Sequence, residues 1–125
     1  MRNDKGNIIV EKTFQFALKV VAFCELLEEK RKYFVARQLL KSGTSVDANT
    51  REAQNAESKA DFIYKLKIAA NKADETEYWL LIGKHAPTYP FEEQLLTNIQ
   101  EIIKILSKIL SSSKTNAKTI TQRSP

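Results

Sequence analysis

The stretch that decides the fold reads Gln38-Leu39-Leu40-Lys41-Ser42-Gly43-Thr44-Ser45-Val46 and is followed by Asn49 and Glu52. Its apolar residues recur at helical spacing, on a track made of Val35, Leu39, Val46 and Ala53. The remaining positions of that track are Ser42 and Asn49. A second track beside it is polar and consists of Gln38, Ser42, Ser45, Asn49 and Glu52. Steps of four and three residues keep both tracks on one face, so the stretch predicts a helix with small and polar residues on its packed side.

Polar residues on a packed face need partners, because an unpaired buried polar group costs about 1–3 kcal/mol. We expect a polar network, within the bundle or at a subunit contact, formed by Gln38, Ser42, Ser45, Asn49, Glu52 and Glu77. Asn49 and Glu52 are expected to be largely buried and bonded to another helix or subunit. Gly43 would let a second backbone come close. A break around Gly43 is the alternative, although the apolar track continues straight through it.

Three further segments have helical periodicity, which gives four in all: about Val10 to Lys30, Tyr33 to Ala56, from Ser58 onward, and from near Pro90 to Leu110. Ser58 with Asp61 matches a capping box, and Gly83 followed by Pro87 predicts a left-handed glycine cap and a helix stop. The first two connections are very short, which favours antiparallel neighbours. The predicted fold is all-α, an antiparallel up-down-up-down four-helix bundle over residues 1–110.

The first segment is apolar over more of its circumference than one bundle core requires. One wide apolar face is made by Phe14, Ala17, Val21 and Cys24 with the adjacent Leu18 and Leu27, and it is broadened by Phe16, Val20 and Phe23. An amphipathic helix needs only a stripe at the i, i+3, i+4, i+7 positions. We therefore expect the surplus to contact another subunit, in an oligomer larger than a dimer.

The last fifteen residues differ in composition from the rest. Residues 111–125 are rich in Ser, Thr and Lys, contain no acidic residue, and have Ala117 and Ile120 as their only hydrophobic residues. Such a segment buries too little surface to offset its ordering entropy. The sequence predicts a disordered basic tail.

The residues needed for common catalytic and metal sites are missing from the sequence. Di-iron bundles use two Glu-x-x-His pairs, and this chain has one histidine, His85, and one cysteine, Cys24. Ser42, Thr44 and Ser45 are the candidate nucleophiles, but no histidine is predicted nearby as their base. Glu52 and Glu77 could form an acid/base pair, but a structural polar network is the favoured interpretation. We expect no catalytic residues, no metal and no cofactor, and hence no enzyme.

The single cysteine excludes a disulfide framework within a monomer, and no signal peptide or run of about 20 apolar residues is present. We expect a cytoplasmic protein without a membrane partner.

The charge balance is basic, with a net charge of +5 at pH 7. Positive charge attracts nucleic acid without sequence preference. The candidate contacts are Arg51, Lys59, Lys65 and Lys72. Taken singly, each is usually a solvated side chain, but an oligomer would repeat them by symmetry.

Two blocks of the chain resemble a known family. The first is Gln38 to Val46 with Ala48-Asn49 and Arg51-Glu52-Ala53, and the second is Ser58 to Ala69 with Glu75 to Leu80. In this order they are similar to the bacterial four-helix bundle proteins encoded in intervening sequences of large-subunit ribosomal RNA genes. The accessory protein of diversity-generating retroelements is related to that family. The resemblance covers roughly residues 10 to 110.

The resemblance implies a ring-shaped homo-oligomer, typically a pentamer. The retroelement relatives bind RNA or DNA and a reverse transcriptase, so the resemblance also implies these partners. We therefore expect a non-enzymatic module that binds nucleic acid weakly through repeated basic surfaces. The alternative is a structural assembly or protein–protein adaptor whose positive charge serves solubility alone.

Overall fold

The computed structural model describes residues 7–123 of the 125-residue chain, with side chains described for residues 7–113. It contains four helices: α1 (Ile8–Glu29), α2 (Tyr33–Ala53), α3 (Lys59–His85) and α4 (Glu93–Arg123). The described residues contain no β-strand. The predicted all-α fold with four helices is therefore confirmed.

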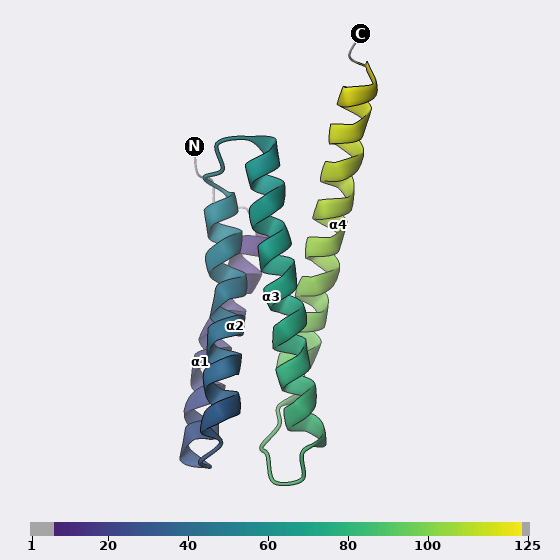
Figure 1. The fold of residues 1–125 in the computed structure, drawn as a ribbon. Helices are drawn as coiled ribbons and strands as arrows, with labels where there is room; N and C mark the ends of the chain where they lie inside the picture. Colours follow the sequence, from purple (N-terminus) through teal and green to yellow (C-terminus); the bar gives the residue numbers. More distant parts are fainter. Residues whose placement is uncertain (1–6, 124–125) are drawn as a thin grey trace.

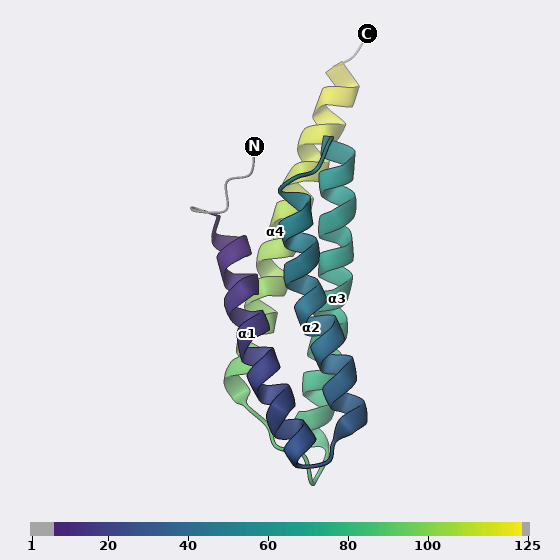
Figure 2. The ribbon, with the colours of Figure 1, turned by 90° about the vertical axis from the view of Figure 1, so that its left-hand side faces the viewer.

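Each helix packs against two others, in the cyclic order α1, α2, α3, α4 and back to α1. The chain turns back at every loop, so the α1–α2 and α3–α4 loops lie at one end and the α2–α3 loop at the other (Figures 1 and 2). This order leaves α1 and α3 at opposite corners of the bundle.

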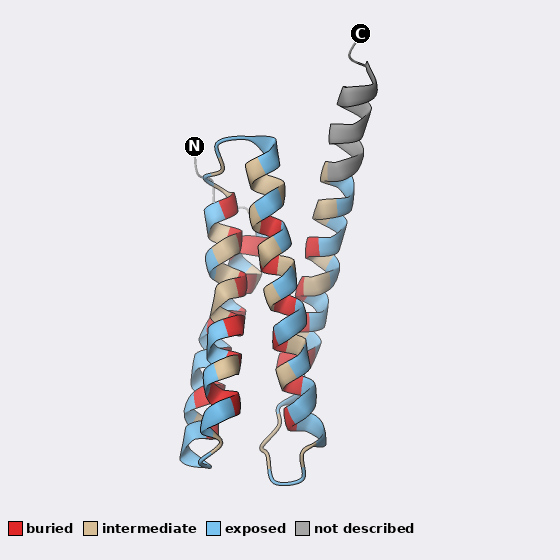
Figure 3. Ribbon diagram, in the orientation of Figure 1, coloured by how far each residue is buried: buried red, intermediate tan, exposed pale blue. Residues whose placement is uncertain are grey.

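The core lies between the inward faces of the helices, where Figure 3 shows the buried residues. The largest buried side chains are Phe16, Val20 and Leu27 of α1, Leu39 and Val46 of α2, Leu66 and Leu80 of α3, and Leu95, Ile99, Ile102 and Leu106 of α4. The four-three spacing of Phe62, Leu66, Ala69, Ala73, Thr76 and Leu80 predicts the packed face of α3, and all of them except the half-buried Phe62 are buried. The 3.5-residue repeat thus identifies the packed faces of α2, α3 and α4.

Helix α2 continues unbroken through Gly43, so the alternative of a break there is wrong. A Cβ atom at Gly43 would lie 3.0 Å from Cγ1 of Val20 and 3.1 Å from its Cγ2. Val20 belongs to α1 and is fully buried. The glycine is therefore explained by the close approach of α1, which offsets the low helix propensity of glycine.

The start of α3 follows the predicted capping box. Ser58 Oγ accepts a hydrogen bond from the Asp61 backbone N–H at 3.0 Å. The Asp61 carboxylate accepts from the backbone N–H of Glu57 at 3.3 Å, one residue before the capping serine. Together these bonds pair two backbone N–H groups at the start of the helix.

The predicted left-handed cap at Gly83 is wrong. Helix α3 runs on to His85, and no described glycine has a positive φ. The helix ends instead at Ala86, which is extended (φ −78°, ψ 123°) and precedes Pro87. A proline disfavours helical geometry in the residue before it, so the stop comes from Pro87.

The left-handed residue lies at the end of α1 and is Arg31, with φ 63°. Around it, the Lys32 N–H donates to the Leu27 carbonyl at 2.8 Å and the Arg31 N–H donates to the Glu28 carbonyl at 2.9 Å. These two bonds form a Schellman motif, which turns the chain directly into α2. No glycine or asparagine marks this turn in the sequence.

Two helix boundaries differ from the predicted ones. Helix α2 ends at Ala53 rather than Ala56, and α4 runs to Arg123, past the boundary predicted at Leu110. No glycine or proline interrupts residues 111–124. The side chains from residue 114 onward, and all of residues 124–125, lie outside the described part of the chain. The disorder predicted for residues 111–125 thus stays a prediction.

Candidate functional site

Ser42 is the residue of the predicted polar network that bonds across helices through its hydroxyl. It is fully buried and accepts a hydrogen bond from Thr76 Oγ1 of α3 at 3.0 Å. Thr76 Oγ1 also lies 2.7 Å from the Lys72 carbonyl, and Ser42 Oγ lies 3.4 Å from the Leu39 carbonyl. The pair therefore closes a small polar contact inside the α2–α3 seam.

The other predicted members of the network lie nearer the surface. Ser45 donates to the Lys41 carbonyl at 2.6 Å, and Asn49 Nδ2 donates to the Ser45 carbonyl at 2.9 Å. Both bonds stay within α2, so the inter-helix partner expected for Asn49 is not found among the residues that the structure describes. Gln38 and Glu77 are half-buried.

The expected burial of Glu52 is wrong for the single chain. Its side chain is 63% exposed and lies 3.9 Å from Lys65 Nζ of α3. Residue 52 thus lies on an outward side of α2, where a carboxylate stays solvated. A role for Asn49 and Glu52 at a subunit contact remains a prediction.

A polar contact that the sequence analysis missed joins α1 to α2. Thr13 is fully buried, and its hydroxyl lies 2.8 Å from the Ile9 carbonyl and 3.2 Å from Asp47 Oδ1. Asp47 in turn pairs with Arg51 at 3.3 Å, and the Arg51 guanidinium lies 4.9 Å from the centre of the Phe14 ring. The sequence contains a signal for this contact, because Thr13 is a polar residue at a core position in the apolar pattern of α1.

The candidate nucleic-acid contacts do not form an uninterrupted positive surface. Lys65 pairs with Glu52, Lys72 with Glu75 at 3.8 Å, and Arg51 with Asp47. Lys59 is exposed in the first turn of α3. Exposed ion pairs add little stability, but each carboxylate lowers the positive potential around its lysine or arginine. The Lys65–Glu52 pair crosses from α3 to α2 and depends on how the helices are rotated. The other two pairs have i,i+3 and i,i+4 spacing within one helix, so the sequence could have shown them.

A stripe of large apolar side chains lies on the outer surface of α1. Phe14 is 40% exposed, Leu18 50% and Val21 41%. Their i, i+4, i+7 spacing places them side by side on one face. Phe16, Val20 and Leu27 face the core instead, so the expectation that Phe14, Leu18 and Val21 belong to the main packed face is wrong for the single chain, because α1 is rotated toward Phe16 and Val20. We call Phe14, Leu18 and Val21 the α1 stripe.

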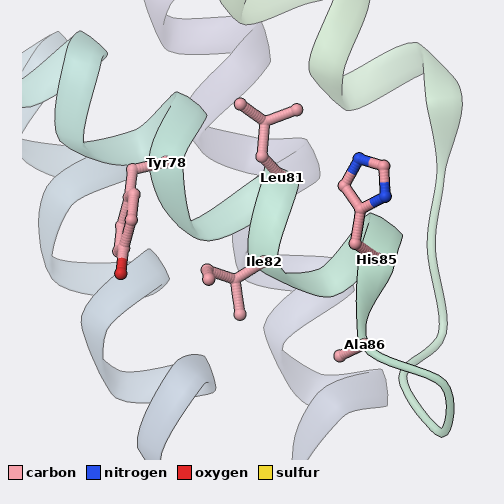
Figure 4. Close-up of a pocket in the computed structure, with 5 residues that line it drawn as sticks. All are labelled: Tyr78, Leu81, Ile82, His85 and Ala86. Atoms are coloured by element: carbon pink, nitrogen blue, oxygen red, sulfur yellow. The ribbon is translucent and has the colours of Figure 1, made fainter.

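A second apolar surface lies at the C-terminal end of α3. Tyr78, Leu81, Ile82, His85 and Ala86 line an open pocket of about 390 Å³, which is almost wholly apolar (Figure 4). Beside it, the Trp79 ring makes edge-on contacts with Phe34 of α2 at 5.7 Å and with Tyr78 at 4.9 Å, measured between ring centres. We call the pocket-lining residues the α3 pocket.

The described residues include no group of three or more His, Cys, Asp and Glu side chains placed to hold a metal ion. Burial raises the pKa of the Cys24 thiol to about 12, and the Glu28 carboxylate acts in the same direction. The thiol is thus protonated and poorly nucleophilic at neutral pH. None of the helices, over the residues described, is long and apolar enough to cross a membrane.

The sequence profile of one protein family, described as "23S rRNA-intervening sequence protein", matches residues 5–111. The chain belongs to this family. The match covers the four-helix region, so the resemblance inferred from the two sequence blocks is confirmed.

A solved structure of the same kind supports the fold. The chain is similar to a protein with unknown function from the S23 ribosomal protein family of Bacteroides thetaiotaomicron VPI-5482, with 39% sequence identity and a TM-score of 0.79. The similarity covers 84% of this chain and 96% of the Bacteroides chain. No curated protein matches the chain. Neither family nor neighbour carries a description of enzymatic activity.

Proposed function

We propose that this member of the 23S rRNA-intervening sequence protein family is a non-enzymatic assembly module. Its antiparallel bundle is the repeating unit of a ring-shaped homo-oligomer, with five copies as the expected number. The observation that carries the proposal is the α1 stripe, in which three large apolar side chains remain exposed next to a complete core.

Isolated exposed hydrophobic residues are common on monomers, but contiguous apolar surface points to an interaction site. The α1 stripe is contiguous along two turns of one helix, and the α3 pocket adds a second apolar surface on the opposite corner of the bundle. Covering both surfaces would remove tyrosine, phenylalanine and aliphatic side chains from water, which is the main driving force of association.

The hydrogen bonds of the candidate nucleophiles support a non-enzymatic role. The hydroxyls of Ser42, Thr44 and Ser45 lie within hydrogen-bond distance of the backbone carbonyls of Leu39, Leu40 and Lys41. These bonds stay within the helix, as is common for serine and threonine inside helices. The hydroxyls therefore serve the bundle rather than a substrate.

The test is mass by light scattering at tens of micromolar protein in physiological salt. The chain weighs 14.3 kDa, and the expected mass is about five times that of one chain. Leu18→Glu should lower the mass, because it places a charge in the stripe. Gln15→Glu is the matched control, since it adds the same charge to an exposed position of α1 outside the stripe and should leave the mass unchanged. A wild-type monomer would refute the proposal.

A second candidate function is weak binding of RNA or DNA, favoured by the net charge of +5. Lys114, Lys118 and Arg123 add positive charge without any acidic residue near them in the sequence. A ring would repeat this charge around its axis. The family description, which refers to 23S rRNA, is consistent with an RNA partner. A reverse transcriptase partner rests on the resemblance to the retroelement accessory protein alone.

The ion pairs provide a sharp test of the nucleic-acid candidate. Replacing the carboxylate partners, in Glu52→Gln with Glu75→Gln, should strengthen binding because it frees the positive charge of Lys65 and Lys72. Replacing those lysines, in Lys65→Glu with Lys72→Glu, should weaken binding. The assay is fluorescence anisotropy with labelled RNA and DNA, and log affinity should fall linearly with log salt. If micromolar protein does not bind at about 50 mM salt, the conditions of lowest screening in the series, the assembly role stands alone.

A further inference from the structure

We infer that the outward side of α3 is a second contact between copies of this chain, in which two α3 helices pack antiparallel around a two-fold axis at Asn71. The inference goes beyond the proposed ring and does not depend on it, because α3 occupies the corner of the bundle opposite the α1 stripe. It follows from the order of apolar and charged side chains along α3, which is complementary to its own reverse.

The residues of this contact point away from the bundle. The packed side of α3 is marked by the buried Ala69, Ala73 and Thr76. The exposed Asn71, Glu75 and Tyr78 each follow one of these residues by two positions, which is about 200° around a helix of 3.6 residues per turn. We call the exposed residues on this side the α3 outer face, which consists of Ala60, Tyr64, Lys67, Asn71, Asp74, Glu75, Tyr78, Leu81, Ile82 and His85.

Side chains at equal distances on either side of Asn71 are complementary when the two helices run in opposite directions. Four residues away are Lys67 and Glu75, so each lysine comes level with a carboxylate of the second copy. Seven residues away are Tyr64 and Tyr78, which are 62% and 54% exposed and would pack ring against ring. Steps of four and seven residues return to the same side of a helix, so these pairs follow one line of contact.

The centre and the ends of the contact fit the same arrangement. At the axis, Asn71 meets the Asn71 of the second copy, and two amide groups can donate to and accept from each other. A single asparagine at a helix contact fixes the register. Eleven residues from the axis, Ala60 comes level with Ile82, which lines the α3 pocket (Figure 4). Beyond it, His85 faces the segment just before the helix, where Glu57 is exposed. The second copy thus covers an apolar surface that the single chain leaves open to water.

The charges beside these pairs favour the antiparallel arrangement. Asp74 lies next to Glu75 and adds a second carboxylate opposite Lys67. Lys72, one turn from Thr76, lies at the edge toward α2 and pairs with Glu75 at 3.8 Å. A parallel arrangement would place Asp74 and Lys67 opposite copies of themselves, where like charges repel.

The other charged side chains of α3 are turned away from this contact. Lys65 pairs with a carboxylate of α2 at 3.9 Å, and Lys84 with one of α4 at 3.6 Å. Lys59 and Glu77 lie on the same side as Lys84, because they precede it by about seven turns and two turns. Asp61 accepts a hydrogen bond at the start of the helix. The two lysines and two carboxylates at the contact itself cancel in charge, so a second copy fits this face better than a nucleic acid does.

The Leu18→Glu variant, which blocks the proposed ring contact, allows the α3 contact to be measured by itself. One helix face is a small interface, and small interfaces are weak. Sedimentation equilibrium should therefore show the mass rising from one chain to two as the concentration of this variant rises from about ten to several hundred micromolar. A mass of one chain over the whole range would overturn the inference.

Charge reversal in the Leu18→Glu background tests the pairing of Lys67 with Glu75. Lys67→Glu places two acidic residues opposite each other and Glu75→Lys two basic ones, so each variant should stay monomeric. An equimolar mixture of the two, and the double variant by itself, should dimerise again, because opposite charges face each other once more. Lys108→Glu is the matched control, since it reverses an exposed charge on α4 and should leave dimerisation unchanged. Circular dichroism checks that every variant is folded. A double variant that stays monomeric would overturn the antiparallel register.

A cysteine at the two-fold axis provides a measurement that does not depend on the ring. In a Cys24→Ala background, Asn71→Cys should form a disulfide between two copies under mild oxidation and give a covalent dimer. Lys67→Cys is the matched control, because residue 67 is exposed one turn away but comes level with Glu75 rather than with its own copy, and it should give no covalent dimer. Absence of the Asn71→Cys dimer would overturn the inference whatever the mass of the wild type. A wild type that forms dimers but no larger species would refute the ring and leave the α3 contact standing.

Discussion

The close contact between Gly43 and Val20 makes a prediction that can be worked out in magnitude. In Gly43→Ala the new methyl group would lie 3.0 Å from a methyl of Val20, which is fully buried and cannot move toward solvent. Overpacking of this kind costs about 1–3 kcal/mol, and a β-branched side chain has few other rotamers. The exchange also gains about 1 kcal/mol of helix propensity. We expect a net loss of stability of about 1 kcal/mol.

The double-mutant cycle with Val20→Ala separates the cost of overpacking against Val20 from the gain in helix propensity. Removing the two methyl groups of Val20 costs about 2–3 kcal/mol by itself, counting the lost transfer energy and the residual cavity. In that background Gly43→Ala meets no clash, so it should stabilise the protein by about 1 kcal/mol. The expected coupling energy is therefore about 2 kcal/mol, well above the usual additivity error of about 0.5 kcal/mol.

The assay is urea unfolding followed by circular dichroism, at a fixed protein concentration because the proposed assembly would contribute to apparent stability. Gly43→Ser introduces a slightly larger side chain than Gly43→Ala. It should lower the free energy of unfolding more than alanine does where Val20 is present, but not in the Val20→Ala background. If Gly43→Ala has the same effect in both backgrounds, the close approach of α1 and α2 does not explain the glycine.

Three further predictions concern local features of the fold. Arg31→Gly should raise the free energy of unfolding by about 1 kcal/mol, because Arg31 has a left-handed backbone conformation that glycine adopts without strain. Arg31→Ala should not raise it, and chemical denaturation of both variants and the wild type tests this. Ser58→Ala should lower the free energy of unfolding by about 1 kcal/mol through loss of the helix cap, and Ser58→Asp should restore it. The Cys24 thiol has a folded pKa of about 12 against an ordinary value of 9.0, so the unfolded chain loses its proton first as pH rises. The free energy of unfolding of the wild type should therefore fall relative to that of Cys24→Ala between pH 9 and pH 12, by up to about 1.4 kcal/mol per pH unit. If thermal unfolding of the two proteins changes equally with pH over that range, the buried-thiol argument is wrong.

The helices and most of the core could be predicted from the sequence, because a heptad-like repeat of apolar residues identifies the buried face of a helix. Thr76 and Ala73 could be placed in the core this way despite their small size. The capping box at Ser58 was equally readable, since it depends on residues three apart in one segment. Family membership followed from the two blocks in α2 and α3.

The parts that could not be predicted depend on distances between helices. The choice between Phe14 and Phe16 as a core residue requires the rotation of α1, which a wide apolar face leaves open. The pairing of Lys65 with Glu52 crosses from α3 to α2, and it changes both a predicted buried acid and a predicted nucleic-acid contact. The turn at Arg31 carries none of the residues that usually mark a left-handed position, so its geometry follows from the packing of α1 on α2.

The narrow seam at Gly43 links the inside of the bundle to its outside. Because α1 lies so close to α2 at Val20, a methyl group added at residue 43 would require one of the two helices to shift. The distance between α1 and α2 and the direction in which the α1 stripe faces therefore depend on the same residue. A larger side chain at residue 43 would displace α1 and, with it, the α1 stripe on the outer surface, so a substitution inside the bundle would also change the surface that we propose for assembly. Residue 43 is accordingly the core position at which a substitution would affect the proposed assembly as well as the packing of the bundle.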